Sequence, residues 1–219
     1  IVITLSRSGR TSEIVRAVHH IKGTLGCPVL SISMQPDNDI MPMSDCDLTL
    51  DWCYDRSVCQ TRTVTNLYAA MTLLVAFYSR DTLLTESVAA AVARNAAHLS
   101  SNRFMLETIG RMDWNNAVVL ADGAVIGLAE EGALAFTEIA MLPGRCFNLL
   151  DYRHGPIVLN DSKTLTIALL QPSAEQLQKA MVEDLKSHGG IVVTVDNQPD
   201  NPYDTTAHIQ LQGIDRYEA

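Results

Sequence analysis

The stretch that decides the fold is IVITLSRSGRTSE, residues 1–13. It begins with three β-branched apolar residues, Ile1–Ile3, which is typical of a buried strand. Apolar residues then recur at helical spacing between Ile14 and Ile21. The polar residues in between are therefore predicted to form a turn from the carboxyl end of a strand to the amino end of a helix.

This turn has the composition of an anion-binding loop. The first amides of a helix have no intrahelical partner and the helix dipole is positive there. Hydroxyl groups add donors, and a glycine lets the backbone approach a ligand closely. We therefore predict a phosphate monoester site. Its candidate binding residues are Ser6, Arg7, Ser8, Gly9 and Thr11.

A simpler interpretation is that Thr11 or Ser12 only caps the helix and Gly9 only makes a turn. Three hydroxyls around one glycine, directly after a strand, favour the phosphate site. No Gly-Lys-Ser/Thr sequence follows, so a nucleoside triphosphate site is not predicted.

Composition excludes several classes of partner. Among the 219 residues, 47% are hydrophobic, which is enough to fill a core, and the net charge is −9. Without a long basic block, binding to nucleic acid is not predicted. Apolar segment 63–78 is too short to span a membrane, so no membrane association is predicted. Five cysteines without regular spacing indicate reduced thiols and a cytoplasmic protein.

Strand and helix patterns alternate along the chain, which predicts an α/β fold with parallel sheets. After the first strand and helix, further strands are expected at 27–33, 46–52, 117–120, 164–170, 190–195 and 207–211. Helices are expected over 64–79, 81–111, 125–141 and 174–187, the second as one or two helices. The chain starts without Met and ends without a terminating element, so we expect a piece of a longer protein.

Two carboxylates of the fourth predicted helix share one face. Glu131 and Glu138 are separated by two helical turns, whereas Glu130 lies about 100° round the helix and is expected to face solvent. A carboxylate on the apolar side of a helix is costly unless it is partnered. From the residues alone, Glu131 and Glu138 could form a site or an acidic surface stripe.

Four motifs in this order resemble the sugar isomerase (SIS) family. They are SxSGxT at 6–11, S-V-x-x-T at 57–61, E-G-A-L-x(3)-E at 131–138 and H-G-P at 154–156. The chain is similar to the isomerase half of glucosamine-6-phosphate synthase and to related sugar-phosphate isomerases and fructosamine-6-phosphate deglycases. The resemblance implies tandem SIS-like modules of three α/β/α layers. These would be 1–80 and 112–219, with linking helices at 81–111, and each module would lack a terminal part.

The resemblance also implies roles for particular residues. Glu138 resembles the catalytic base that moves a proton between C1 and C2, and Glu131 a carboxylate that supports the site. His154 resembles the group that opens the sugar ring in the neighbouring subunit, which implies a homodimer or higher homo-oligomer. Residues that resemble the lining of the sugar pocket are Val58, Gln60 and Thr61.

The departures from the family pattern narrow the activity. Ala135 stands where the synthase has a lysine, and these residues include no glutamine-hydrolysing domain, so amidotransfer is not predicted. We expect an aldose/ketose isomerase or a deglycase of an (amino)sugar 6-phosphate, since both begin with proton abstraction. Alternatives are a phosphosugar sensor of a regulator and an inactive structural half of a dimer. No metal or cofactor is predicted: His19 and His20 are adjacent on a helix and cannot easily share one ion.

Overall fold

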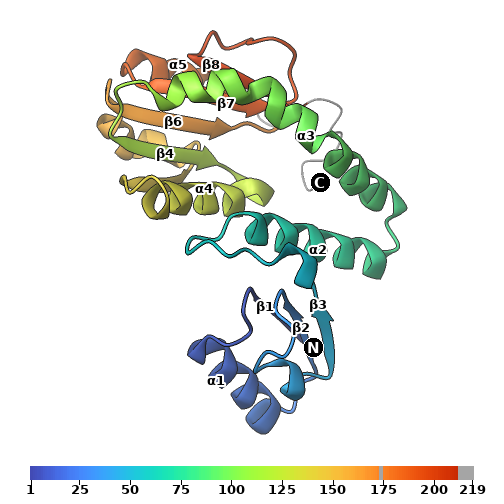
Figure 1. Ribbon diagram of the computed structural model, residues 1–219. Coiled ribbons are helices and arrows are strands. Elements are labelled where there is room, and N and C mark those ends of the chain that lie inside the picture. Colours follow the sequence, from blue (N-terminus) through green and yellow to red (C-terminus); the bar gives the residue numbers. More distant parts are fainter. Residues whose placement is uncertain (173–174, 212–219) are drawn as a thin grey trace. The chain divides into compact units, whose positions relative to one another are not determined.

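The computed structural model describes residues 1–172 and 175–211. Two compact units divide the chain, Ile1–Tyr78 and Ser79–Ala219 (Figure 1). The predicted helix start at Ala174 and the last part of the predicted second module, 212–219, lie outside the described residues. The assignment of the two units to separate SIS modules stays a prediction.

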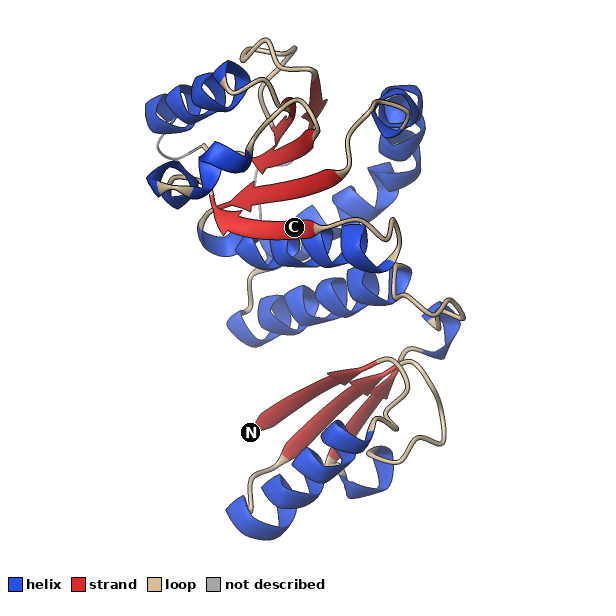
Figure 2. Cartoon of the chain, turned by 90° about the vertical axis from the view of Figure 1, so that its left-hand side faces the viewer, coloured by secondary structure: helices blue, strands red, loops and turns tan. Residues whose placement is uncertain are grey.

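The first unit contains a parallel sheet with the strand order β1-β2-β3. Helix α1 packs on one face of it, where Val18 meets Val29 and Ile40 in a small apolar cluster (Figure 2). This arrangement places the carboxyl end of β1 directly before the amino end of α1. The elements are β1 (Val2–Ser6), α1 (Ser12–His20), the π-helical turn η1 (Ile21–Leu25), β2 (Val29–Ser33), η2 (Met41–Met43), β3 (Cys46–Thr49), η3 (Asp51–Cys53) and α2 (Arg62–Ser79).

The second unit contains a five-stranded parallel sheet with the order β5-β4-β6-β7-β8. The single long helix α3 precedes it. The elements are α3 (Thr82–Gly110), β4 (Asn116–Ala121), η4 (Gly123–Val125), α4 (Ile126–Glu138), β5 (Gly144–Asn148), η5 (Asp151–His154), η6 (Pro156–Leu159), β6 (Thr164–Leu169), α5 (Glu175–Ser187), β7 (Ile191–Asp196) and β8 (Ala207–Gln210).

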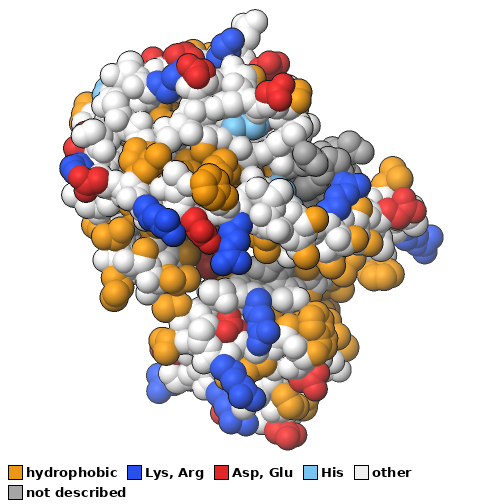
Figure 3. All heavy atoms as spheres, turned by 45° about the horizontal axis from the view of Figure 1, so that its top comes forward, with side chains coloured by type: hydrophobic (Ala, Val, Ile, Leu, Met, Phe, Trp, Pro, Cys, Tyr) orange, Lys and Arg blue, Asp and Glu red, His pale blue; other side chains and the backbone are white. Residues whose placement is uncertain are grey.

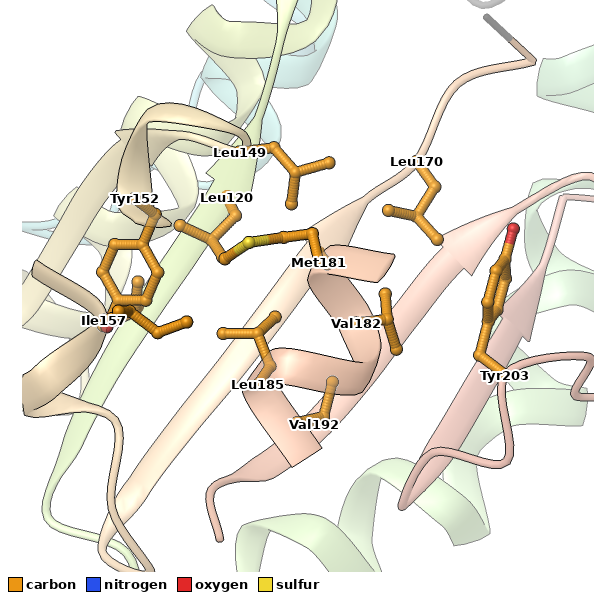
Figure 4. Packing of buried hydrophobic residues seen from close by; sticks show 12 residues of the cluster. Leu120, Leu149, Tyr152, Ile157, Leu170, Met181, Val182, Leu185, Val192 and Tyr203 are labelled. Atoms are coloured by element: carbon orange, nitrogen blue, oxygen red, sulfur yellow. The ribbon is translucent and has the colours of Figure 1, made fainter. Parts of the chain in front are cut away.

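Both faces of this sheet are covered, as a parallel sheet requires. Successive residues of β4 point to opposite faces: Val118 and Leu120 join one core cluster, whereas Val119 joins another. The first cluster packs the sheet against α5, whose Met181, Val182 and Leu185 are fully buried (Figure 4). The opposite face packs on α4 and the end of α3. The second unit therefore has three layers.

The predicted α/β class with parallel sheets is confirmed. Strand β5 was missed because it is a short edge strand that contains Gly144 and Arg145 and alternates weakly. Gly144 is needed there: an added Cβ would overlap the carbonyl of Ala133 in α4, so strand and helix approach closely.

On the face of the molecule shown in Figure 3, acidic and basic side chains are interspersed. Within the part of the chain that the structure describes, no helix is long and apolar enough to cross a membrane.

Candidate functional site

The loop between β1 and α1 is built around Gly9. This residue has φ +62°, a left-handed backbone conformation that residues with a Cβ rarely adopt. An added Cβ would also lie 2.5 Å from Oδ1 of Asn38. Glycine is therefore required here both by the backbone conformation and by the space.

The buried side chain of Asn38 packs against Gly9 and is held in place by hydrogen bonds. It is 2% exposed, and its Nδ2 donates to Oγ of Ser33 (3.0 Å) and to the carbonyl of Gln35 (2.8 Å). Its Oδ1 accepts from the amides of Ile40 and Met41. Asn38 was not predicted from the sequence, because an asparagine in a polar loop has no pattern that separates it from its neighbours.

The serine hydroxyls of the loop accept hydrogen bonds from the backbone. Oγ of Ser6 accepts from the amide of Gly9 (2.9 Å), and Oγ of Ser8 accepts from the amide of Arg10 (3.3 Å). An oxygen that accepts from an amide keeps its own hydrogen for another acceptor. The two half-buried hydroxyls can therefore donate to an anion.

Thr11 occupies the N-cap position of α1 but does not cap the helix with its side chain. An N-cap threonine usually accepts a hydrogen bond from an amide of the first turn. Here the exposed hydroxyl makes no such bond, so it and the first-turn amides can meet a ligand. This geometry is compatible with the predicted phosphate site.

Arg7 joins this loop to the S-V-x-x-T segment of the same unit. Its Nη1 donates to the carbonyl of Ser57 at 2.6 Å, with longer contacts of 3.5 Å to the carbonyls of Asp55 and Val58. Two predicted binding segments, far apart in the sequence, are thus brought together in the first unit. The three residues predicted to line the sugar pocket, Val58, Gln60 and Thr61, are all exposed.

Asp55 organises the S-V-x-x-T segment and was missed by the sequence analysis. Its carboxylate accepts from the amide and hydroxyl of Thr61 (2.9 and 2.6 Å) and from the amide and hydroxyl of Ser57 (3.1 and 2.7 Å). These bonds, that from the Thr61 hydroxyl first, hold the pKa of Asp55 well below its usual range. The only available signal was an acidic residue just before the motif.

In the second unit, α4 carries the predicted carboxylates. Glu131 is half-buried, and Glu130 and Glu138 are exposed. Burial, and secondly the charge of Glu138, raise the pKa of Glu131. The two carboxylates therefore interact along one face of α4, and Glu131 binds its proton more tightly than an exposed glutamate.

His154 ends the short helix η5, and its ring is exposed. The two residues directly before it anchor the segment. Tyr152 is 1% exposed in the core, and Nε of Arg153 contacts Oδ2 of Asp184 in α5 at 2.6 Å. The backbone of η5 is thus held against the unit while the imidazole faces outward.

Among residues 1–172 and 175–211, no group of three or more His, Cys, Asp or Glu side chains is arranged to hold a metal ion.

No protein-family model matches the chain. The glutamine–fructose-6-phosphate aminotransferase [isomerizing] of Shewanella oneidensis is 23% identical over 203 residues, which are 88% of this chain and 33% of that protein. The chain spans about a third of the length of the curated relatives that it matches.

Solved structures share the fold. The C-terminal domain of glucosamine-fructose-6-phosphate aminotransferase from Francisella tularensis superposes with a TM-score of 0.81 at 18% identity, covering 96% of this chain and 63% of that one. Tagatose-6-phosphate ketose/aldose isomerase from Escherichia coli gives 0.81 at 23% identity, covering 95% and 60%. The chain therefore has the α/β fold of phosphosugar isomerases. The resemblance to the SIS family is confirmed, because homologues and structural neighbours are both consistent with a SIS domain.

Proposed function

We propose that this chain binds a sugar phosphate and processes it by carboxylate-mediated proton transfer at C1 and C2. The observation that carries the proposal is the loop after β1, where the hydroxyls of Ser6 and Ser8 accept from amides and so keep their own hydrogens available for a ligand. Donor hydroxyls at a helix amino terminus suit a phosphate monoester. The relatives, which are named for reactions of fructose 6-phosphate, support this ligand class.

The proton-transfer groups of the proposal lie in the second unit. Glu138, exposed at the end of α4, is proposed as the base that takes the proton from the carbon next to the carbonyl. Glu131 is proposed to support it, since it is half-buried on the same face of α4 and interacts electrostatically with Glu138. His154 is proposed to open the sugar ring, because an imidazole can both give and take a proton near neutral pH.

Isomerase and deglycase reactions share this first step, so the same carboxylate serves either substrate, a hexose 6-phosphate or a fructosamine 6-phosphate. The alternative is a SIS module that senses a phosphosugar without converting it. The presence of Glu138 and His154 together favours the enzyme, because a sensor has no use for a proton-transfer pair.

Phosphate binding is tested with Ser8→Ala in the full chain. The variant should weaken hexose 6-phosphate binding by about 1–3 kcal/mol, because a hydrogen bond to a charged ligand is lost. Titration calorimetry or the thermal shift caused by the ligand measures this loss. Ser100→Ala, at an exposed position in the middle of α3, is the control and should bind as the wild type does. Equal affinity of Ser8→Ala and wild type would contradict the phosphate assignment.

The reaction is tested by mass spectrometry of the products formed from a panel of hexose 6-phosphates and fructosamine 6-phosphates. A new sugar phosphate of equal mass, separated by chromatography, identifies an isomerase, whereas a free amine identifies a deglycase. Binding without conversion of any panel member would favour the sensor.

We further propose a cytoplasmic homodimer or higher homo-oligomer in which His154 serves the site of a neighbouring subunit. Sedimentation should then show an oligomer at working concentration. Mixing Ser8→Ala chains, which should bind the substrate weakly, with His154→Ala chains should restore part of the activity, because one kind of mixed site has both residues. A fully active monomer would contradict subunit sharing.

A further inference from the structure

The hydroxyls in the two joined segments of the first unit have opposite hydrogen-bond polarity. A backbone amide can only donate and a carboxylate can only accept. Ser6 and Ser8 face amides, so their oxygens accept and their hydrogens remain for a ligand. Ser57 and Thr61 face the carboxylate of Asp55, so their hydrogens are used and their oxygens can only accept from a ligand.

The alternative partner of Ser57 leads to the same polarity. Its hydroxyl also lies within hydrogen-bonding reach of the carbonyl of Cys59, which again can only accept. The hydroxyl of Thr61 donates to Oδ2 of Asp55 at 2.6 Å, and its side chain is exposed. The amides of Ser57 and Thr61 hold the same carboxylate, so the four donors leave it no freedom to turn.

Asp55 also makes this segment unfavourable for an anion. It is 7% exposed and remains ionised, because its pKa lies well below the usual range. A phosphate placed beside Ser57 and Thr61 would meet oxygens that cannot donate and a negative charge behind them. A sugar hydroxyl, which can donate, meets suitable partners at the same place.

We propose that Asp55 is a positioning residue that fixes segment 57–61 as a hydrogen-bond acceptor, so that the first unit selects a sugar monophosphate and rejects a second phosphate. Arg7 supports this arrangement, since it lies in the loop that contains Ser6 and Ser8 and donates a hydrogen bond to the carbonyl of Ser57. The donating hydroxyls and the accepting hydroxyls are thereby kept next to each other. A ligand with a phosphate at one end and hydroxyls at the other matches this pair of segments. The proposal rests on the proposed function, because it requires a sugar phosphate as the ligand.

Two variants test it in the full chain by titration calorimetry with inorganic phosphate, a hexose 6-phosphate and a hexose bisphosphate. Thr61→Val preserves the shape and removes the acceptor hydroxyl. It should weaken hexose 6-phosphate binding by roughly 3- to 10-fold and leave the affinity for inorganic phosphate unchanged. Thr65→Val, at an exposed position of α2, is the matched control and should change neither affinity.

Asp55→Asn removes the charge and supplies an amide donor in its place. It should reduce the preference for hexose 6-phosphate over the bisphosphate by about 10-fold, since a hydroxyl that accepts from the new amide group keeps its hydrogen to donate to the second phosphate. A residue with only a structural role would lower all affinities together and leave this preference unchanged. Should Asp55→Asn disturb the fold, as judged by its circular dichroism, Thr61→Val decides alone.

Failure of the role of Asp55 and failure of the proposed function give different results. If the wild type binds both phosphate and hexose 6-phosphate, but Thr61→Val weakens both equally or neither, the assignment of polarity is overturned and the proposed function stands. If the wild type binds none of the three ligands, the proposed function fails and the role of Asp55 fails with it.

Discussion

Replacing Gly9 by alanine should be unusually costly, because two separate effects add at this position. Gly9 has φ +62°, and an alanine Cβ would lie 2.5, 2.6 and 2.7 Å from Oδ1, Cγ and Cβ of Asn38. Asn38 cannot move away easily, since its amide group makes four hydrogen bonds and is buried. The chain offers a matched control in Gly26, which has φ +61° with nothing within 4 Å of an added Cβ.

The expected loss in the free energy of unfolding is the sum of the cost of the backbone conformation and the cost of the overlap with Asn38. A left-handed conformation costs a residue with a Cβ about 1–2 kcal/mol. Forcing an extra carbon into a packed site costs about a further 1–3 kcal/mol. Gly26→Ala should therefore destabilise the protein by about 1–2 kcal/mol and Gly9→Ala by about 2–5 kcal/mol.

Urea unfolding followed by circular dichroism measures the difference between the two variants. Because the chain has two compact units, the comparison uses the transition that includes the first unit. Adding Asn38→Gly to Gly9→Ala should cost less than the sum of the single changes, since all three side-chain atoms of Asn38 that overlap the added Cβ are then removed. If Gly9→Ala costs no more than Gly26→Ala, the packing of Gly9 on Asn38 is refuted.

Two further predictions concern the second unit. Gly144→Ala should lower the free energy of unfolding by about 1–3 kcal/mol through overlap with the Ala133 carbonyl, whereas Gly127→Ala, in open space within α4, should be neutral or slightly stabilising in the same urea assay. Glu131 has a raised pKa, so the stability it contributes is present below its ordinary pKa and is lost as pH rises through the raised value. Glu131→Gln should therefore flatten the decline of stability as the pH rises above the ordinary glutamate pKa of about 4.3, and Glu138→Gln should lower the pKa of Glu131 in an NMR titration. An equal cost of both glycine changes, or an unchanged Glu131 pKa, would contradict these assignments.

The sequence predicted most of the fold because hydrophobic periodicity reports burial directly. Strands β4, β6 and β7 lie inside the sheet and are rich in β-branched and other apolar residues. Strand β5 lies at the edge and has fewer such residues, so its pairing depends on β4 rather than on a local signal. The close approach of Gly144 to α4 is likewise a tertiary requirement.

The candidate site was predictable where a residue type alone carries the chemistry. Hydroxyls and a glycine after a strand predicted the loop at 6–11, and helical spacing placed Glu131 and Glu138 on one face of α4. Asn38 and Asp55 could not be predicted in this way. The sequence around each of them contains no motif that indicates which other residues it contacts. Asn38 packs against Gly9, which is distant in the sequence. Asp55 accepts hydrogen bonds from the hydroxyls of Ser57 and Thr61 and so leaves their oxygens only as acceptors for a ligand.

The measurement that tests the central claim most directly is the exchange of the substrate C2 proton with solvent deuterium, followed by NMR on a hexose 6-phosphate that the chain binds. The wild type should exchange this proton, and Glu138→Gln should slow the exchange by roughly 10²–10⁴, the usual contribution of a positioned general base. Glu130→Gln, at an exposed position of the same helix, should exchange as the wild type does. Exchange by Glu138→Gln at the wild-type rate, or none by the wild type, would contradict the account.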